Sequence, residues 1–122
     1  MKIRDADETI KELGWNCLND LSYFGALSND VIADLLENGV IRHYQKGEYV
    51  VRVDQVACDF QVILRGRVAY YRRFDGRDVL TRNFNQGEQM GFDQMIGLLK
   101  QNGTDVAQED SLIVDISGEQ FF

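Results

Sequence analysis

Five glycines divide the stretch from Lys46 to Phe92 into short runs, each about the length of one β-strand. The runs combine β-branched, aromatic and aliphatic residues with alternating polar ones, which is typical of a pleated and half-buried strand. They cover residues 49–53, 60–65, 67–73 and 79–84. Asp75-Gly76 separates the last two runs and is a strong short-range signal for a β-hairpin. The sequence therefore predicts an antiparallel β core.

The alternation also predicts which side chains share a face of that core. Phe60, Val62 and Leu64 fall on one face of their strand, and we expect Val68 and Tyr70 to join them across the turn. Six of the thirteen basic side chains lie between Arg65 and Arg82. Because these arginines alternate with apolar residues, a solvated outer face of the hairpin is favoured, and a basic patch for an anionic ligand is the alternative.

Short helices and further strands are predicted on both sides of this stretch. Apolar residues at helical spacing predict a helix over 7–21, interrupted at Gly14 and Trp15, and a second over 29–38. Ser28 is a good N-cap for the second helix and Gly39 a good C-terminal residue. The remaining predicted elements are strands over 40–44, 106–107 and 112–116, a short helix over 93–99 and a loop over 101–105.

Composition and charge narrow the class of protein. The chain of 122 residues is 44% apolar and 27% charged, as in an ordinary soluble domain, and no apolar run approaches the length of a membrane span. The N-terminus has no secretory signal, so Cys17 and Cys58 are expected to be reduced thiols in the cytoplasm. A net charge of −7 disfavours non-specific attraction to nucleic acid.

Catalytic and metal-dependent chemistry finds little support in the sequence. A metal centre in a β-barrel needs two or three histidines with a carboxylate, and this chain has only His43. A single histidine also leaves no Ser-His-Asp or Cys-His set to assemble. We therefore expect neither a metal site nor an enzyme, and we interpret His43 as a structural or surface residue.

Gly91 opens the most informative element for ligand binding. It lets the backbone approach a ligand closely, and the predicted helix behind it would direct free N–H groups at an anion. Gly91 could equally relieve a tight corner of a barrel. The residues alone leave both interpretations open.

The order of these elements resembles the cyclic-nucleotide-binding domain, the sensor part of catabolite-activator-type bacterial transcription regulators. The resemblance rests on the segments Lys46-Gly47-Glu48, Val62 to Val68, Asn85 to Gly91 and Leu112 to Ile116. It implies an antiparallel jelly-roll barrel with flanking short helices. It also implies a division into an N-terminal helical segment, residues 1–20, and the barrel domain, residues 21–122.

The family's two charged ligand contacts are missing from the matching positions. In the family, a glutamate after the second glycine binds the ribose, and an arginine about ten residues later binds the cyclic phosphate. Here Phe92 follows Gly91, the stretch 102–105 directly before Val106 contains no arginine, and Lys100 is a weak substitute. The expected pocket is therefore degenerate, binds cyclic nucleotide poorly and has no certain cofactor. Its candidate residues are Gly91, Phe92, Asp93, Asn102, Gly103, Thr104 and Asp105.

Two functions follow from the resemblance. The first is a regulatory domain that senses a small-molecule effector, with a homodimer formed by residues beyond Phe122. The second is a degenerate barrel that acts in protein interaction or senses a different effector. We expect that the 122 residues are a fragment or a sensor-only product, and that they do not bind DNA alone, because no basic recognition helix is present.

Overall fold

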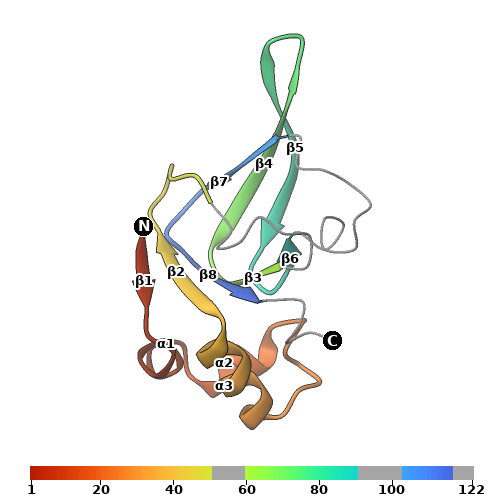
Figure 1. Ribbon diagram of the computed structural model, residues 1–122. Helices are drawn as coiled ribbons and strands as arrows, with labels where there is room; N and C mark the ends of the chain where they lie inside the picture. The colour runs from red at the N-terminus through yellow and green to blue at the C-terminus, as the bar shows by residue number, and fades with distance from the viewer. Residues whose placement is uncertain (51–59, 91–102, 117–122) are drawn as a thin grey trace.

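The computed structural model describes residues 1–50, 60–90 and 103–116 of the 122-residue chain. Eleven elements make up these residues: β1 (Lys2–Arg4), α1 (Ala6–Leu13), α2 (Trp15–Asp20), α3 (Asn29–Asn38), β2 (Val40–Tyr44), β3 (Phe60–Arg65), β4 (Arg67–Phe74), β5 (Arg77–Asn85), β6 (Gln89–Met90), β7 (Gly103–Ala107) and β8 (Ser111–Ile116). The three helices lie together at one end, below the strands (Figure 1). None of the described helices is long and apolar enough to span a membrane.

The strands form two antiparallel sheets. One sheet has the order β1-β2-β8-β3-β6 and the other the order β5-β4-β7. Residues 47–50 extend the second sheet, because they bond to β7 through Ala107 and Asp105 and pair Tyr49 with Val106. The mainly β, antiparallel jelly-roll architecture with flanking short helices is therefore confirmed.

The helices predicted near the N-terminus are confirmed: the region 7–21 forms α1 and α2, separated at Gly14 with Trp15 inside α2, and α3 has the predicted bounds 29–38. Asp5 caps α1 by accepting a hydrogen bond from the Glu8 N–H, and Gly14, at φ 82°, separates α1 from α2. In α3, Ser28 Oγ accepts from the Val31 N–H, and the Gly39 N–H donates to the Leu35 carbonyl. These contacts satisfy backbone groups that a helix end leaves without intrahelical partners.

An outer core joins the helices to one face of the five-stranded sheet. The helical layer contributes side chains such as Phe24, Ile32 and Leu36, and the sheet contributes alternate residues such as Val62 and Val114. All five are at most 1% exposed. Val62 and Leu64 of β3 and the even-numbered positions of β8 therefore face the helices.

An inner core fills the space between the two sheets. Its buried members are Tyr44, Val50, Ile63, Val68, Met90, Ala107 and Ile113. The prediction that Val68 shares a face with Val62 and Leu64 is thus wrong. Both faces of β3 are buried, and Val68 packs with Ile63 on the inner side, because β3 and β4 belong to different sheets.

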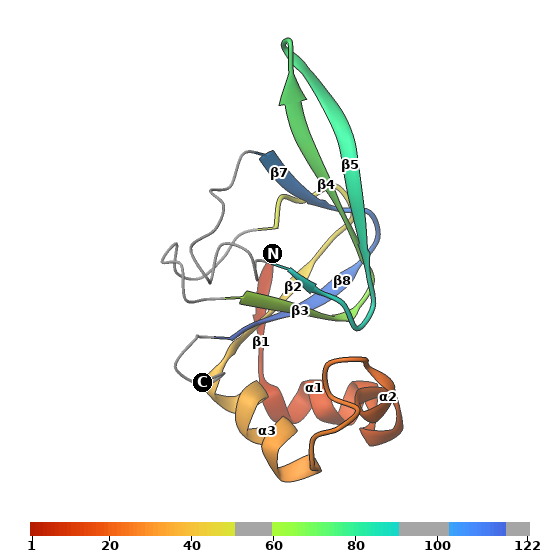
Figure 2. The same cartoon turned by 90° about the vertical axis from the view of Figure 1, so that its right-hand side faces the viewer.

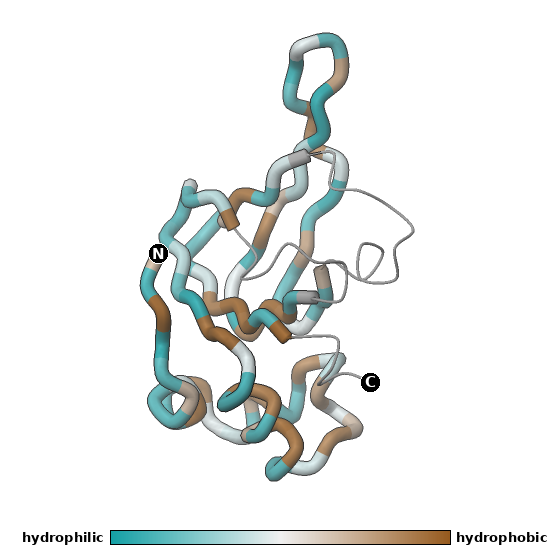
Figure 3. The backbone as a smooth tube through the Cα atoms, viewed as in Figure 1, coloured by the Kyte–Doolittle hydropathy of each residue, from teal (hydrophilic) through white to brown (hydrophobic). Residues whose placement is uncertain are grey.

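The β4–β5 hairpin confirms the Asp-Gly turn. Asp75 and Gly76 have φ angles of 49° and 77°, as a two-residue type I′ turn requires, and Phe74 pairs with Arg77 directly beside it. The hairpin projects beyond both sheets at the end opposite the helices (Figure 2). It is mostly hydrophilic along its length (Figure 3). Strand β5 is an edge strand with nearly every residue exposed.

Two further differences from the predicted elements concern strands. Lys2–Arg4 forms β1, which pairs with β2, although no apolar pattern predicts a strand there. The loop predicted over 101–105 is wrong from Gly103 onward, because β7 starts there and pairs with β4. The strand predicted over 49–53 is described only at residues 49 and 50, and the helix predicted over 93–99 lies outside the described residues.

Candidate functional site

The site is built on the inner face of the barrel, where the cross-strand register defines which side chains meet. In the three-stranded sheet, β4 and β7 place Val68 opposite Ala107 and Tyr70 opposite Asp105. Directly opposite residues share one face of a sheet. Because Val68 and Ala107 belong to the inner core, Asp105 also lies on the inner face.

Asp105 is the one candidate residue that the structure places, with a buried side chain, on this face. It is only 7% exposed, and its carbonyl accepts a hydrogen bond of 2.9 Å from the Val50 N–H. Burial of a carboxylate is costly in free energy unless neighbouring groups compensate it. An acidic side chain inside the barrel is therefore a feature that packing alone does not favour.

The other predicted site residues fall into two groups. Gly103 opens β7 opposite Arg72, and Thr104 is exposed and pairs with Tyr71 on the face opposite that of Asp105. Gly91, Phe92, Asp93 and Asn102 lie outside the described residues, so their grouping with Asp105 stays a prediction.

A second polar group on the inner face was not predicted from the sequence. Arg42 of β2 and Asp115 of β8 form an ion pair, with 3.9 Å between Nη1 and Oδ2 and side-chain exposures of 13% and 4%. Gln61, which is 1% exposed, is the direct cross-strand neighbour of Asp115 on β3. A sequence signal existed, since Gln61 and Asp115 each interrupt an otherwise apolar strand that is buried on both faces.

The buried charged side chains that the structure describes on the inner face are mostly acidic. Two carboxylates, Asp105 and Asp115, lie there with Arg42, which already pairs with Asp115. Arg82 occupies the same cross-strand row as Asp105, but its side chain is 60% exposed and pairs with Glu88 at 3.4 Å. Arg52 and Lys100 lie outside the described residues. The described inner wall is therefore acidic on balance.

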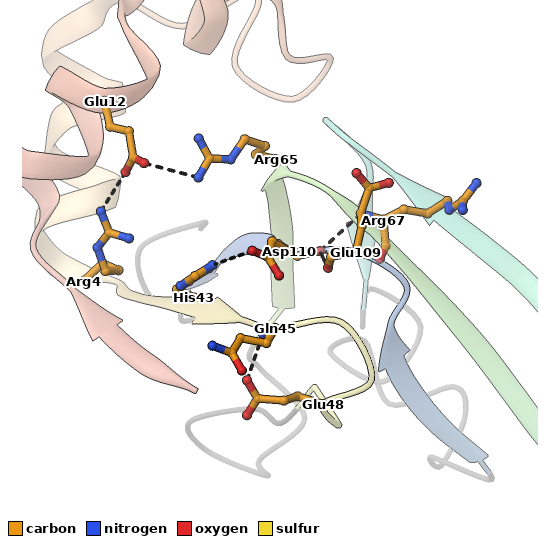
Figure 4. Close-up of polar contacts among 10 residues, drawn as sticks. Arg4, Glu12, His43, Gln45, Glu48, Arg65, Arg67, Glu109 and Asp110 are labelled. Carbon is orange, nitrogen blue, oxygen red and sulfur yellow. Dashed lines mark hydrogen bonds and ion pairs between the residues drawn. The ribbon is translucent and has the colours of Figure 1, made fainter.

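His43 and Cys17 lie away from this face. His43 of β2 pairs with Leu112, on the side of the sheet that faces the helices, and its Nε2 is 3.9 Å from Asp110 (Figure 4). Cys17 is a free, partly buried thiol on α2. Within the described part of the chain, no three histidine, cysteine or acidic side chains are grouped as a metal site would require.

A small ion-pair network connects helix α1 to strands β1 and β3 of the five-stranded sheet. Glu12 of α1 binds Arg4 at 2.6 Å and Arg65 at 3.3 Å (Figure 4). Partial loss of solvent around the Glu12 carboxylate raises its pKa, but the hydrogen bonds from Arg65 and Arg4 outweigh that effect and lower the pKa overall. Similarly, the hydrogen bond from the N-terminal ammonium lowers the pKa of Glu48, helped by the Gln45 N–H.

Comparison with known families identifies the class of protein. Residues 41–122 match the family described as cyclic nucleotide-binding domain. The chain therefore belongs to the cyclic nucleotide-binding domain family. No curated protein sequence matches the chain.

Solved structures with the same fold come from kinase regulatory subunits and from transcriptional regulators. The chain is 19% identical, with a TM-score of 0.70, to a mutant regulatory subunit of a cAMP-independent protein kinase A from Trypanosoma brucei bound to cAMP. It is 18% identical, with a TM-score of 0.67, to the corresponding subunit from Trypanosoma cruzi bound to guanosine. These matches cover 95% and 93% of this chain but only 42% and 41% of those proteins.

A bacterial sensor domain is similar to the same degree. The sensor domain of the transcriptional regulator DNR from Pseudomonas aeruginosa is 21% identical with a TM-score of 0.70, over 92% of this chain and 76% of that one. At these identities the similarity establishes the fold alone. The family expected from the resemblance is thus confirmed, whereas the identity of the ligand depends on this chain's own residues.

Proposed function

We propose that this protein is a ligand-sensing regulatory domain of the catabolite-activator type whose pocket takes an uncharged or cationic effector instead of a cyclic nucleotide. The observation that carries the proposal is the buried carboxylate of Asp105 on the inner face. Among the described residues of that face, the partly buried arginine Arg42 pairs with a second carboxylate, Asp115. An effector with a hydrogen-bond donor suits this wall, because a carboxylate only accepts.

The loss of affinity for cyclic nucleotide can be estimated from the missing contacts. Charge-assisted hydrogen bonds contribute about 1.5–3 kcal/mol each, so losing the arginine–phosphate and glutamate–ribose contacts costs about 3–6 kcal/mol. That loss takes a micromolar site to about millimolar or weaker. Asp105 adds like-charge repulsion of the phosphate. Phe92, if it occupies the family's glutamate position, places an apolar ring where sugar hydroxyls would bind.

Two of the similar structures support this direction. The Trypanosoma cruzi subunit is bound to guanosine, which has no phosphate. The cAMP-bound Trypanosoma brucei subunit is a mutant in which a glutamate is replaced by alanine, a threonine by arginine and a valine by alanine. Removal of an acid and addition of an arginine are the changes that this chain would need in order to hold a cyclic phosphate.

Isothermal titration against cyclic AMP, cyclic GMP and guanosine tests the proposal. We expect cyclic nucleotides to bind with a dissociation constant of about 1 mM or weaker. Asp105→Asn should tighten their binding about tenfold, because it removes one like charge. Asp110→Asn, an identical change in the exposed turn before β8, is the matched control and should leave the affinity unchanged. A low-micromolar constant for cyclic AMP in the unmodified chain contradicts the proposal. Thr104 is not a suitable position for this test, because it is exposed on the other face of β7.

The remaining parts of the proposal concern the setting of the domain. We propose a cytoplasmic, non-catalytic role in which the chain does not bind DNA by itself. In a longer protein, residues beyond Phe122 would form a homodimer and carry the output. Gel retardation by the 122-residue chain at physiological salt would contradict the DNA part.

A further inference from the structure

The β4–β5 hairpin presents two chemically different faces outside the barrel. Cross-strand pairing places Arg72 opposite Val79 and Phe74 opposite Arg77, so these four residues share one face, which we name the hairpin face. The other face carries Arg73 opposite Asp78, where the charges offset each other, and Tyr71 opposite Leu80. The hairpin face therefore has two arginines and no acid.

Apolar surface accompanies the charge on the hairpin face. Phe74 is 50% exposed and Val79 is 43% exposed. The Arg72 guanidinium lies 5.3 Å from the centre of the Phe74 ring, toward the tip of the hairpin. Within the described part of the chain, no carboxylate forms an ion pair with Arg72 or Arg77. Arginine stacked on an aromatic ring next to apolar side chains is a composition typical of protein interfaces.

A complementary surface lies at the opposite end of the same molecule. Helix α3 carries Asp30, Asp34 and Glu37 and no basic residue. Their spacing of four and three residues aligns them in one stripe, which we name the acidic stripe. Val31, at the margin of the stripe, is 44% exposed. No lysine or arginine among the described residues forms an ion pair with these three carboxylates.

The chain segments that carry the two surfaces have opposite net charges, and the charged groups of the two surfaces are similarly spaced. Residues 65–82 hold six arginines and two aspartates, a net charge of +4, whereas residues 5–37 hold eight acidic residues and one lysine, a net charge of −7. Arg72 and Arg77 are diagonal neighbours across two strands, about 7 Å apart. Carboxylates one helical turn apart are separated by about 6 Å, so both can be engaged at once.

We propose that the hairpin face of one molecule docks on the acidic stripe of a second copy of this chain. Because the hairpin and the helices lie at opposite ends (Figures 1 and 2), two molecules aligned antiparallel make this contact twice around a two-fold axis. Such an interface is isologous and closes as a dimer. It is independent of the effector proposed for the inner face.

Other anionic partners fit the hairpin less well. A nucleic acid or an anionic membrane is an extended polyanion, and the acidic remainder of the chain would repel it wherever contact extends beyond the hairpin.

Direct edge-to-edge pairing of β5 with another strand is also disfavoured. The register of β5 against β4 shifts between Tyr70 and Tyr71, and such a bulge hinders regular pairing at the outer edge.

Sedimentation velocity of the unmodified chain over a range of concentrations tests the proposal first. We expect a dimer at about 10 mM ionic strength that dissociates at about 150 mM, because the screening length falls from roughly 30 Å to roughly 8 Å. A chain that stays monomeric up to millimolar concentration at low salt would overturn the proposal. So would an assembly that persists in molar salt or grows beyond the dimer with concentration.

Charge reversal then identifies the two surfaces. Arg72→Glu/Arg77→Glu and, separately, Asp34→Lys/Glu37→Lys should each raise the dimer dissociation constant at least tenfold, because like charges then meet at both contacts. Mixing the two variants should restore a dimer, since every contact again joins opposite charges. Rescue by mixing cannot arise from unfolding of either variant, so it separates a docking role from a structural one.

A matched control removes the effect of net charge. Lys2→Glu/Lys46→Glu changes the charge by the same amount as the hairpin variant, at exposed positions outside both surfaces, and should leave the dissociation constant within about twofold. Absence of rescue on mixing, an equal effect of the control, or stable binding of the monomer to anionic phospholipid vesicles would each overturn the proposal.

Discussion

The outer and inner cores of this protein are both well buried, but they differ in the polarity of their side chains. The cluster between the helices and the five-stranded sheet consists of apolar side chains, several of them fully buried. The space between the two sheets contains apolar residues too, but Arg42, Gln61, Asp105 and Asp115 share its face. Both cores use opposite faces of the same strands, β3 and β8.

This difference agrees with the proposal that the outer core stabilises the fold and the inner core binds the effector. Burying apolar surface is the main favourable contribution to folding, whereas a buried ion pair often stabilises no more than apolar residues of the same size. Charged groups on the inner face therefore do not follow from the requirements of stability. The proposed effector-binding role depends on these residues.

The largest expected effect is in the outer core. Phe24→Ala removes a ring that is 0% exposed and should lower the free energy of unfolding by about 3–5 kcal/mol, through lost burial and a cavity. Phe84→Ala is the matched inner change. Phe84 is only partly buried, on edge strand β5, and should cost about 1 kcal/mol. Urea denaturation of both variants measures the difference, and equal losses would contradict the division of roles.

The buried ion pair provides the next test. Arg42→Met leaves Asp115 buried beside an apolar side chain and should cost about 3 kcal/mol, at the low end for a broken buried pair because Arg42 keeps some solvent access. The double variant Arg42→Met/Asp115→Leu should recover most of that loss while changing effector affinity. A double variant as unstable as the single one would show that the pair is needed for folding itself.

Most of the fold could be predicted from the sequence because local signals and tertiary contacts agree. Ser28 and Gly39 bound α3 as expected, and Asp75-Gly76 forms the expected turn. The sequence could not predict which side chains of β3 and β4 enter the same core. Val62 and Ile63 look equally apolar, and only the assignment of β3 and β4 to different sheets decides that Val68 meets Ile63. When both faces of a strand are buried, the alternation of apolar and polar residues that would distinguish the two faces is absent.

The candidate site was predicted less completely for a related reason. Asp105 was identified through the family resemblance, but its apparent loop is a strand. Gly103 and Asp105 are residue types that strands disfavour, and pairing with β4 overrides that preference. Arg42, Gln61 and Asp115 are far apart in sequence and meet only through the register of β2, β8 and β3. That register depends on long-range pairing, which no short motif encodes.

Two glycines in tight turns give a third test, intermediate in size. Gly66, between the two sheets, has φ 109°, and a Cβ there would come within 2.7 Å of Ser111 Cα, so Gly66→Ala should cost about 1–3 kcal/mol. Gly76 has φ 77° at the hairpin tip with no atom near a Cβ, and Gly76→Asn should cost well below about 1 kcal/mol because Asn tolerates this conformation. Thermal unfolding of both variants provides the measurement. Equal destabilisation would mean that backbone conformation matters and the close approach to Ser111 does not.

The smallest expected effect comes from Glu12, which joins the helical layer to the sheet through Arg4 and Arg65. Its pKa is lowered from the ordinary value of 4.5, so its contribution to stability is complete above that value and is lost as pH falls through the lower folded-state pKa. Because the carboxylate is largely exposed, the contribution should be about 0.5 kcal/mol. Glu12→Gln should therefore be less stable than the unmodified chain at neutral pH, and the two should converge once the pH is well below 4.5. Glu109→Gln, the same change in an exposed turn, is the matched control and should leave the stability at neutral pH unchanged. A difference between the Glu12 variant and the unmodified chain that stays constant with pH would show that the side chain acts through packing, and that the ion pairs do not hold the outer layer on the sheet.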